Sequence, residues 1–212
     1  MNSTKFPEMS LASFTKELAG DSPTPGGGSA AALAGCLAAA LCAMVSRLTL
    51  GRDKYKDAAE KMESVKDEAD KLWARLLALV DEDATAYNKV TAAFQLPKGT
   101  DEEKAARTGA IQEALKTAAA APLETLKAAA ELCRLCRLVV EEGNPNCLTD
   151  AGVSAQLIRA AAKGAAYNIK INLSSINEPD FCETLAALAT ELLSRTLTDV
   201  SELEEVLERA LD

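Results

Sequence analysis

A stripe of apolar positions runs through the middle of the chain at helical spacing, and one acid interrupts it. The stripe consists of Tyr55, Ala58, Met62, Val65, Ala69, Leu72, Leu76, Val80, Asp83, Tyr87, Val90 and Phe94. Steps of three and four residues keep one face of an α-helix turned toward a core, so the pattern predicts a long helix over residues 53–94. A buried carboxylate costs free energy unless it is paired, and burial raises its pKa toward the range that suits proton transfer. Asp83 is therefore a candidate catalytic group, and the structural alternative is a salt bridge to a nearby Lys or Arg.

Helical patterns continue through almost all of the remaining sequence, and no strand pattern competes with them. The expected helices cover residues 10–20, 29–50, 53–94, 100–121, 122–143, 150–171, 180–195 and 201 onward. Ser29 and Asp150 are each expected to cap a helix N-terminus, and Pro122 is expected in a first turn. Short connections between alanine-rich helices predict an all-α protein, an antiparallel bundle of seven to nine helices. We expect a single domain over residues 1–212.

Composition limits the classes of function. The chain has 212 residues, of which 48% are hydrophobic, enough to supply a core. Its net charge of -9 and its lack of basic clusters argue against nucleic acid and against an anionic membrane as partners, because both require a basic surface. The first residues do not resemble a secretory signal, so we expect a cytoplasmic protein. The apolar run at residues 30–45 is shorter than the roughly 20 residues that a bilayer requires and predicts a buried core helix.

The cysteines favour structural roles over metal binding. The sequence contains six cysteines and no histidine, which is the commonest zinc ligand. Cys133 and Cys136 form a C-x-x-C pair, but they lie inside a helical pattern, and no second pair follows at zinc spacing. We therefore expect reduced, structural thiols and no metal.

A glycine-rich loop precedes the expected second helix. Gly26, Gly27, Gly28 and Ser29 offer bare backbone N–H groups at the positive end of a helix dipole, which suits an anion or a polar ring edge. The loop lacks the Gly-Lys-Ser/Thr ending and the preceding strand of a nucleotide-binding P-loop. The alternative is a tight turn in which glycine supplies positive φ, and spacing alone leaves both interpretations open.

Two amide side chains end a stripe of small residues on the expected helix over residues 150–171. The stripe consists of Leu157, Ala161, Gly164, Asn168 and Asn172. Asn168 and Asn172 are suited to hold a flat heterocycle, although buried amides satisfied by neighbouring backbone are the more common case. Asp150 is a second candidate acid, but capping alone explains an Asp at its position.

The small residues of the second helix also bear on assembly. They permit close approach between helices, yet they leave a lone subunit with a broad, shallow apolar face. A bundle this rich in alanine completes its burial by pairing with a copy of itself, so we expect a homo-oligomer.

Taken together and in order, the polar motifs resemble those of one known family. They are Thr24-Pro25-Gly26-Gly27-Gly28-Ser29, Asp83-Ala84-Thr85-Ala86-Tyr87-Asn88-Lys89-Val90, Asn144-Pro145-Asn146 through Asp150-Ala151-Gly152, and Tyr167-Asn168-Ile169-Lys170-Ile171-Asn172-Leu173. Over nearly its whole length the chain is similar to the formiminotransferase-cyclodeaminase C-terminal domain family. The resemblance implies an all-helical homodimer or higher oligomer without the fused transferase domain. It also implies a formimino-tetrahydrofolate cyclodeaminase, or alternatively a methenyl-tetrahydrofolate cyclohydrolase, with a tetrahydrofolate derivative as substrate.

The implied reactions suggest a role for each candidate residue. Both reactions pass between a cationic amidinium and a tetrahedral carbon, and a sheltered carboxylate stabilises the cation and moves a proton. Our hypothesis assigns acid/base catalysis to Asp83, an assisting or orienting role to Asp150, and closure of the pocket to the glycine loop. The residues expected to hydrogen-bond the pterin or the reacting nitrogen are Asn88, Asn168 and Asn172. Lys89 or Lys170 is expected to meet the folate glutamate carboxylate.

A rival class is a non-catalytic helical protein that binds a partner or serves as a scaffold. In that case Asp83, Asn168 and Asn172 would specify the register between helices, as buried polar groups sometimes do.

Overall fold

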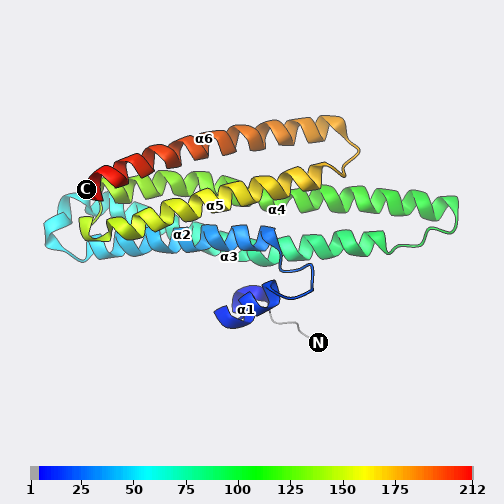
Figure 1. Ribbon diagram of the computed structural model, residues 1–212, viewed down its shortest axis with the longest axis horizontal. Helices are drawn as coiled ribbons and strands as arrows, with labels where there is room; N and C mark the ends of the chain where they lie inside the picture. Colours follow the sequence, from blue (N-terminus) through cyan, green and yellow to red (C-terminus); the bar gives the residue numbers. More distant parts are fainter. Residues whose placement is uncertain (1–4, 212) are drawn as a thin grey trace.

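The computed structural model describes residues 5–211, which form an all-α bundle without strands in that range (Figure 1). Its α-helices are α1 (Leu11–Leu18), α2 (Gly27–Leu50), α3 (Ala59–Phe94), α4 (Asp101–Glu142), α5 (Leu148–Leu173) and α6 (Pro179–Leu211). Three short 3-10 helices accompany them, η1 (Phe6–Glu8), η2 (Asp53–Ala58) and η3 (Pro145–Cys147). The predicted fold class is therefore confirmed, whereas the predicted count of seven to nine helices is too high.

Two predicted helix boundaries do not exist. α4 continues through Pro122, and α6 continues through Ser201. A serine followed three residues later by a glutamate marks a helix start, but the same pair is also ordinary on the exposed face of a long helix, as in α6. The proline removes only one hydrogen bond from α4, the one that the Ala118 carbonyl would accept.

The predicted caps are also corrected in detail. α2 begins at Gly27 with Gly26 as its N-cap, so Ser29 lies inside the first turn and does not cap the helix. Cys147 occupies the N-cap position of α5, and Asp150 follows in the first turn. An acid in the first turn is stabilised by the helix dipole without capping, which explains why the sequence pattern is the same in both cases.

The five long helices lie side by side, and each runs antiparallel to the one before it (Figure 1). The start of α2, the end of α3 and the end of α5 therefore meet toward one end of the bundle, and α4 extends beyond them (Figure 1). The starts of α3 and α5 lie at the opposite end. This alternation decides which polar residues share a site.

The core is centred on α2, which packs against α3, α5 and α4. A side chain at Gly35 would lie 3.0 Å from Leu76 Cδ2, so the missing Cβ brings α2 and α3 close together. By length and composition α2 would suit a membrane span, but 61% of its most apolar window is buried inside the bundle. The prediction of a core helix is confirmed.

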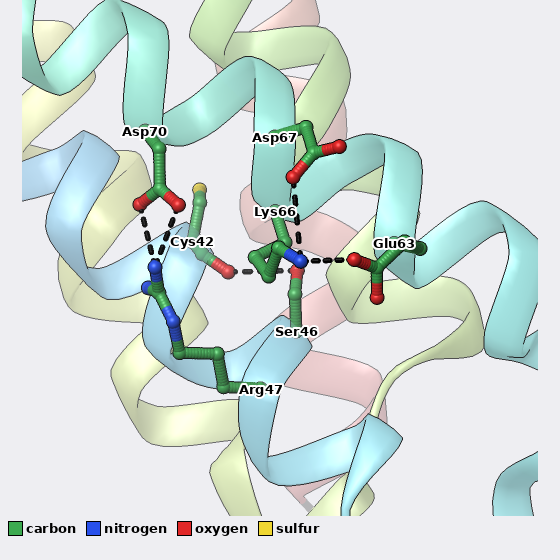
Figure 2. Close-up of polar contacts among 7 residues, drawn as sticks. All are labelled: Cys42, Ser46, Arg47, Glu63, Lys66, Asp67 and Asp70. Carbon is green, nitrogen blue, oxygen red and sulfur yellow. Dashed lines mark hydrogen bonds and ion pairs between the residues drawn. The ribbon is translucent and has the colours of Figure 1, made fainter.

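Ion pairs along α2 and α3 are mostly exposed (Figure 2). Arg47 reaches Asp70 at 2.8 and 2.6 Å, and Lys66 bridges Glu63 and Asp67. Exposed pairs contribute little stability, so apolar packing holds these two helices together. Ser46 is buried between them and donates its hydroxyl to the Cys42 carbonyl at 2.9 Å. The six cysteines are free, and all except Cys182 are buried.

Candidate active site

A pocket of about 420 Å³ opens at the end of the bundle where α2 begins. It is lined by Pro23, Thr24, Gly26, Gly27, Gly28, Asp83, Tyr87, Val90, Thr91, Phe94, Leu115, Ala118, Asn168, Ile171, Asn172 and Ser175. Three groups of residues singled out in the sequence therefore meet: the glycine loop, Asp83, and the pair Asn168 and Asn172. They come from α2, α3 and α5, and α4 supplies the remaining wall.

Asp83 is half-buried, and its carboxylate is held by the first turn of α2. The Ser29 hydroxyl lies 3.0 Å from Asp83 Oδ2 and 2.9 Å from the Val80 carbonyl oxygen, and its single proton is within reach of both acceptors. Burial raises the pKa of Asp83, while hydrogen bonds from the Ser29 side chain and backbone pull it back down. No cationic side chain of residues 5–211 contributes to this shift. The alternative explanation, a salt bridge from Asp83 to a nearby Lys or Arg, is therefore wrong.

Gly28 is required for this contact because its backbone touches the acid. A Cβ at Gly28 would lie 2.1 Å from Asp83 Oδ1 and 2.5 Å from Asp83 Cγ. No glycine among residues 5–211 has a positive φ, so the alternative of a tight turn that needs left-handed glycine is wrong. The glycine instead leaves room for a carboxylate at the positive end of the α2 dipole.

Asn168 and Asn172 both line the pocket and carry side-chain amides. Asn168 Nδ2 donates to the Gly164 carbonyl at 2.8 Å, and Asn172 Nδ2 donates to the Ala118 carbonyl at 3.0 Å. Within residues 5–211 neither side-chain oxygen has a hydrogen-bond partner, so each can accept a bond from a ligand. The interpretation of amides satisfied by backbone is therefore confirmed for their nitrogens, and a role in holding a flat heterocycle stays a prediction for two residues that line the pocket.

The apolar stripe of α3 leaves the core at Asp83. Met62, Val65, Leu76 and Val80 are buried, as predicted. Beyond the acid, however, Tyr87 is 46% exposed and Phe94 is 51% exposed, so the expectation of a continuous buried seam is wrong. The residues of this stripe after Asp83 line the pocket.

Four predicted site residues lie elsewhere. Asp150 is at the opposite end of α5, roughly 27 Å from Asn168 along the helix at 1.5 Å per residue. Asn88 and Lys89 are exposed on α3, and Lys89 lines a separate pocket that η1 and α4 share. Lys170 lines a groove between α5 and α6. Adjacent positions of a helix point about 100° apart, which is why motif neighbours of Asp83 and Asn168 do not share their pocket.

The remaining wall of the pocket cannot be read from the sequence, for two reasons. Tyr87, Val90 and Phe94 lie on the apolar stripe of α3, and helical spacing alone predicts a core position for them. Leu115 and Ala118 carry no signal, because an apolar residue of α4 does not reveal which helix it faces. In the described part of the chain no three His, Cys, Asp or Glu side chains are grouped to hold a metal ion.

Comparisons with known proteins agree on one family. The family model described as formiminotransferase-cyclodeaminase matches residues 10–191. The chain is 40% identical over 173 residues to a methenyltetrahydrofolate cyclohydrolase of Methylorubrum extorquens, covering 82% of this chain and 83% of that protein. It is 34% identical over 194 residues to the formimidoyltransferase-cyclodeaminase of Rattus norvegicus, which covers 92% of this chain but 36% of the longer relative.

A solved structure has the same architecture. The crystal structure of formiminotetrahydrofolate cyclodeaminase from Thermotoga maritima is similar with a TM-score of 0.87 and 26% sequence identity. The similarity covers 96% of this chain and 98% of that one.

Proposed function

Because this chain belongs to the formiminotransferase-cyclodeaminase family, we propose that it is a folate one-carbon enzyme that releases ammonia from formimino-tetrahydrofolate to give 5,10-methenyl-tetrahydrofolate. One observation carries the assignment to a site: Asp83, a half-buried acid with a raised pKa, shares a pocket with two amides and a helix N-terminus. Asp83 and Asn172 each bond to another helix, but they do so at the wall of a cavity, and the similar proteins are named folate enzymes, which favours an enzyme over a scaffold.

A single carboxylate suffices for cyclodeamination. N10 attacks the carbon of the protonated, cationic formimino group on N5, which forms a C–N bond and leaves a tetrahedral carbon bearing the amino group. Asp83 takes the proton that N10 must lose and delivers it to that amino group, which departs as ammonia when its C–N bond breaks. The positive charge then resides on the methenyl bridge, where the Asp83 carboxylate stabilises it. Its raised pKa brings the acid closer to the working pH of such a shuttle.

The other pocket groups suit a reduced pteridine. The ring carries N–H and amino donors, and Asn168 and Asn172 offer carbonyl oxygens that accept them. Tyr87 and Phe94 add apolar and aromatic surface at the same pocket. A volume near 420 Å³ is in the range of pockets that bind a compact ligand.

A second candidate reaction is the hydrolysis of 5,10-methenyl-tetrahydrofolate to 10-formyl-tetrahydrofolate. The 40% identity to a methenyltetrahydrofolate cyclohydrolase over most of both chains favours it. Asp83 would then take a proton from the attacking water and return it to N5 as the N5–C bond breaks, while the remaining hydroxyl proton is lost to solvent and the formyl carbonyl forms. The two reactions share the cation and the tetrahedral carbon, so the same acid serves either.

A paired assay separates the two candidates. Purified protein is given formimino-tetrahydrofolate while ammonia release is measured, and 5,10-methenyl-tetrahydrofolate while the methenyl absorbance is followed. Cyclodeamination predicts enzyme-dependent ammonia release, and hydrolysis predicts enzyme-dependent loss of absorbance without ammonia. If the protein accelerates neither reaction, the proposed function is wrong.

We also propose that the protein is cytoplasmic and acts as a homodimer that pairs through α2. The outer face of α2 carries an apolar stripe at helical spacing, namely Leu33, Leu37, Leu41, Met44 and Leu48. Leu37 is 48% exposed and Leu48 is 45% exposed. A contiguous exposed apolar face is characteristic of a protein interface, and a two-fold pairing buries it on both copies.

A further inference from the structure

Pro122 lies in the middle of α4 and alters the backbone beside the pocket. Proline has no N–H, and its ring crowds the carbonyl four residues before it. The carbonyl affected is that of Ala118, which is therefore left without its intrahelical donor. Ala118 itself lines the pocket. The proline thus creates a free acceptor in the pocket wall, in the interior of a helix, where each carbonyl ordinarily accepts from the N–H four residues on.

Asn172 of α5 donates a hydrogen bond to that carbonyl. Its Nδ2 lies 3.0 Å from the Ala118 carbonyl oxygen, across the α4–α5 contact. A carbonyl only accepts hydrogen bonds, so it selects the NH₂ end of the side-chain amide and turns the oxygen of Asn172 away from α4. Asn168 is oriented in a different way, by the Gly164 carbonyl of its own helix. Of the two amides, only Asn172 depends on α4 for its orientation.

We propose that Pro122 is a positioning residue for substrate binding: it frees the Ala118 carbonyl, which fixes Asn172 with its oxygen available to the pteridine. This inference rests on the proposed function and extends it to a residue that does not touch the substrate. The proline acts because it has no N–H group to donate to the Ala118 carbonyl. A residue at 122 that restores the N–H re-forms the helical bond to Ala118 and competes with Asn172.

The test compares three forms of residue 122 at the same pocket. Pro122→Ala restores the N–H, whereas lactic acid incorporated at position 122 replaces the N–H by an ester oxygen without the proline ring. We expect Pro122→Ala to raise the KM for the folate substrate about 3- to 10-fold, the value of one hydrogen bond, with kcat within twofold of the parent. The lactic acid form should keep the KM of the parent within twofold. The melting temperature of Pro122→Ala should not fall, because alanine favours a helix interior.

Two further variants supply a matched control and a measure of coupling. Thr125 donates its hydroxyl to the Ala121 carbonyl at 3.2 Å, so Thr125→Val alters a neighbouring carbonyl of α4 outside the pocket and should leave the KM unchanged. Asn172→Ala should raise the KM by itself, and adding Pro122→Ala to it should have no further effect. Additive effects of the two substitutions would overturn the proposal, as would a KM for Pro122→Ala within twofold of the parent.

An observation without turnover separates this proposal from the proposed function. In the parent protein the side-chain NH₂ signal of Asn172, assigned by its loss in Asn172→Ala, should show one proton protected from solvent exchange. Pro122→Ala should lose that protection, and the lactic acid form should keep it. If the protein is inactive on both folates but shows this pattern, the proposed reaction is wrong and the orientation of Asn172 by Pro122 is still supported. Equal protection in the parent and in Pro122→Ala would show that Pro122 does not orient Asn172, whether or not the protein is active.

Discussion

The chemistry of Asp83 is set by two neighbouring residues that act in different ways. Gly28 contributes the space in which the carboxyl group lies, and Ser29 contributes the hydrogen bonds that stabilise its charged form. Burial works against that charge and exceeds the contribution of Ser29, since the net shift of the pKa is upward. The sequence identified Asp83 because an acid on an apolar stripe is conspicuous, but it assigned Ser29 to capping.

Removing the Ser29 hydroxyl should move the pH dependence of the enzyme. Ser29→Ala deletes a bond that lowers the pKa of Asp83, so the pKa should rise further and the acidic limb of the kcat/KM profile should shift to higher pH. Ser46→Ala is the control, because Ser46 is also buried in α2 but bonds only to the Cys42 carbonyl. An acidic limb at the same pH in the parent and in Ser29→Ala would contradict this role.

The raised pKa of Asp83 also makes a prediction about stability. Between the ordinary pKa of Asp, about 3.9, and its higher value in the folded protein, the folded state binds more protons, so this acid destabilises the protein as pH rises. Asp83→Asn removes this pH-dependent destabilisation, because asparagine does not ionise. The melting temperature of Asp83→Asn minus that of the parent should therefore grow as pH rises above about 4 and then level off. A difference that stays constant or shrinks with pH would show that burial does not dominate.

At the scale of the elements, the pocket depends on the close approach of the first turn of α2 to α3. Because a Cβ at Gly28 would overlap Asp83, Gly28→Ala should displace the acid and lower kcat/KM at least 100-fold, since displacements near 1 Å have that effect. It should also destabilise the protein by about 1–3 kcal/mol through overpacking. Activity assays and chemical denaturation measure the two effects.

Gly109→Ala is the matched control for this prediction. Gly109 is an exposed glycine of α4, and a Cβ there would have no atom within 4 Å. The substitution should leave activity unchanged and stabilise the protein by about 0.5–1 kcal/mol, the helix propensity gained. If Gly28→Ala behaved like Gly109→Ala, the close contact with Asp83 would not matter for function.

The elements also show what periodicity can and cannot predict. Steps of three and four residues correctly placed Asp83 on the inner face of α3 and Asn168 with Asn172 on one face of α5. They did not reveal that α4 continues through Pro122, because the bond lost at Ala118 is replaced by Asn172, which is distant in sequence. Local propensity takes no account of such tertiary contacts. For the same reason the motifs alone predict Asn88, Lys89 and Lys170 at a pocket that these residues do not line.

At the scale of the whole molecule, antiparallel packing decides the composition of the site. It brings the start of α2 and the ends of α3 and α5 to one end of the bundle and leaves Asp150 at the other (Figure 1). The sequence predicted the bundle and the close approach of its small residues, but relating the ends of helices requires knowledge of their order in space. Only a sequence motif places Asp150 at the site, and a motif does not contain that spatial order.

The apolar stripe of α2 makes a prediction about assembly. Light scattering coupled to gel filtration should give twice the mass of the 22.3 kDa chain for the parent. Leu37→Glu places a charge on the exposed stripe and should give the monomer, whereas Leu188→Glu, which changes a similarly exposed leucine of α6, should leave the dimer intact. A parent protein that elutes as a monomer at micromolar concentration would refute the proposed dimer.

The central claim is that the carboxylate of Asp83 moves the proton in the folate reaction. It is tested most directly by the turnover of Asp83→Asn beside the parent, with formimino-tetrahydrofolate and 5,10-methenyl-tetrahydrofolate each supplied at saturation and the fold checked by circular dichroism. Loss of a general acid/base predicts a decrease in kcat of about 10²–10⁴-fold on the substrate that the parent turns over. A kcat within about threefold of the parent, well inside the range expected for an intact catalyst, would contradict the claim.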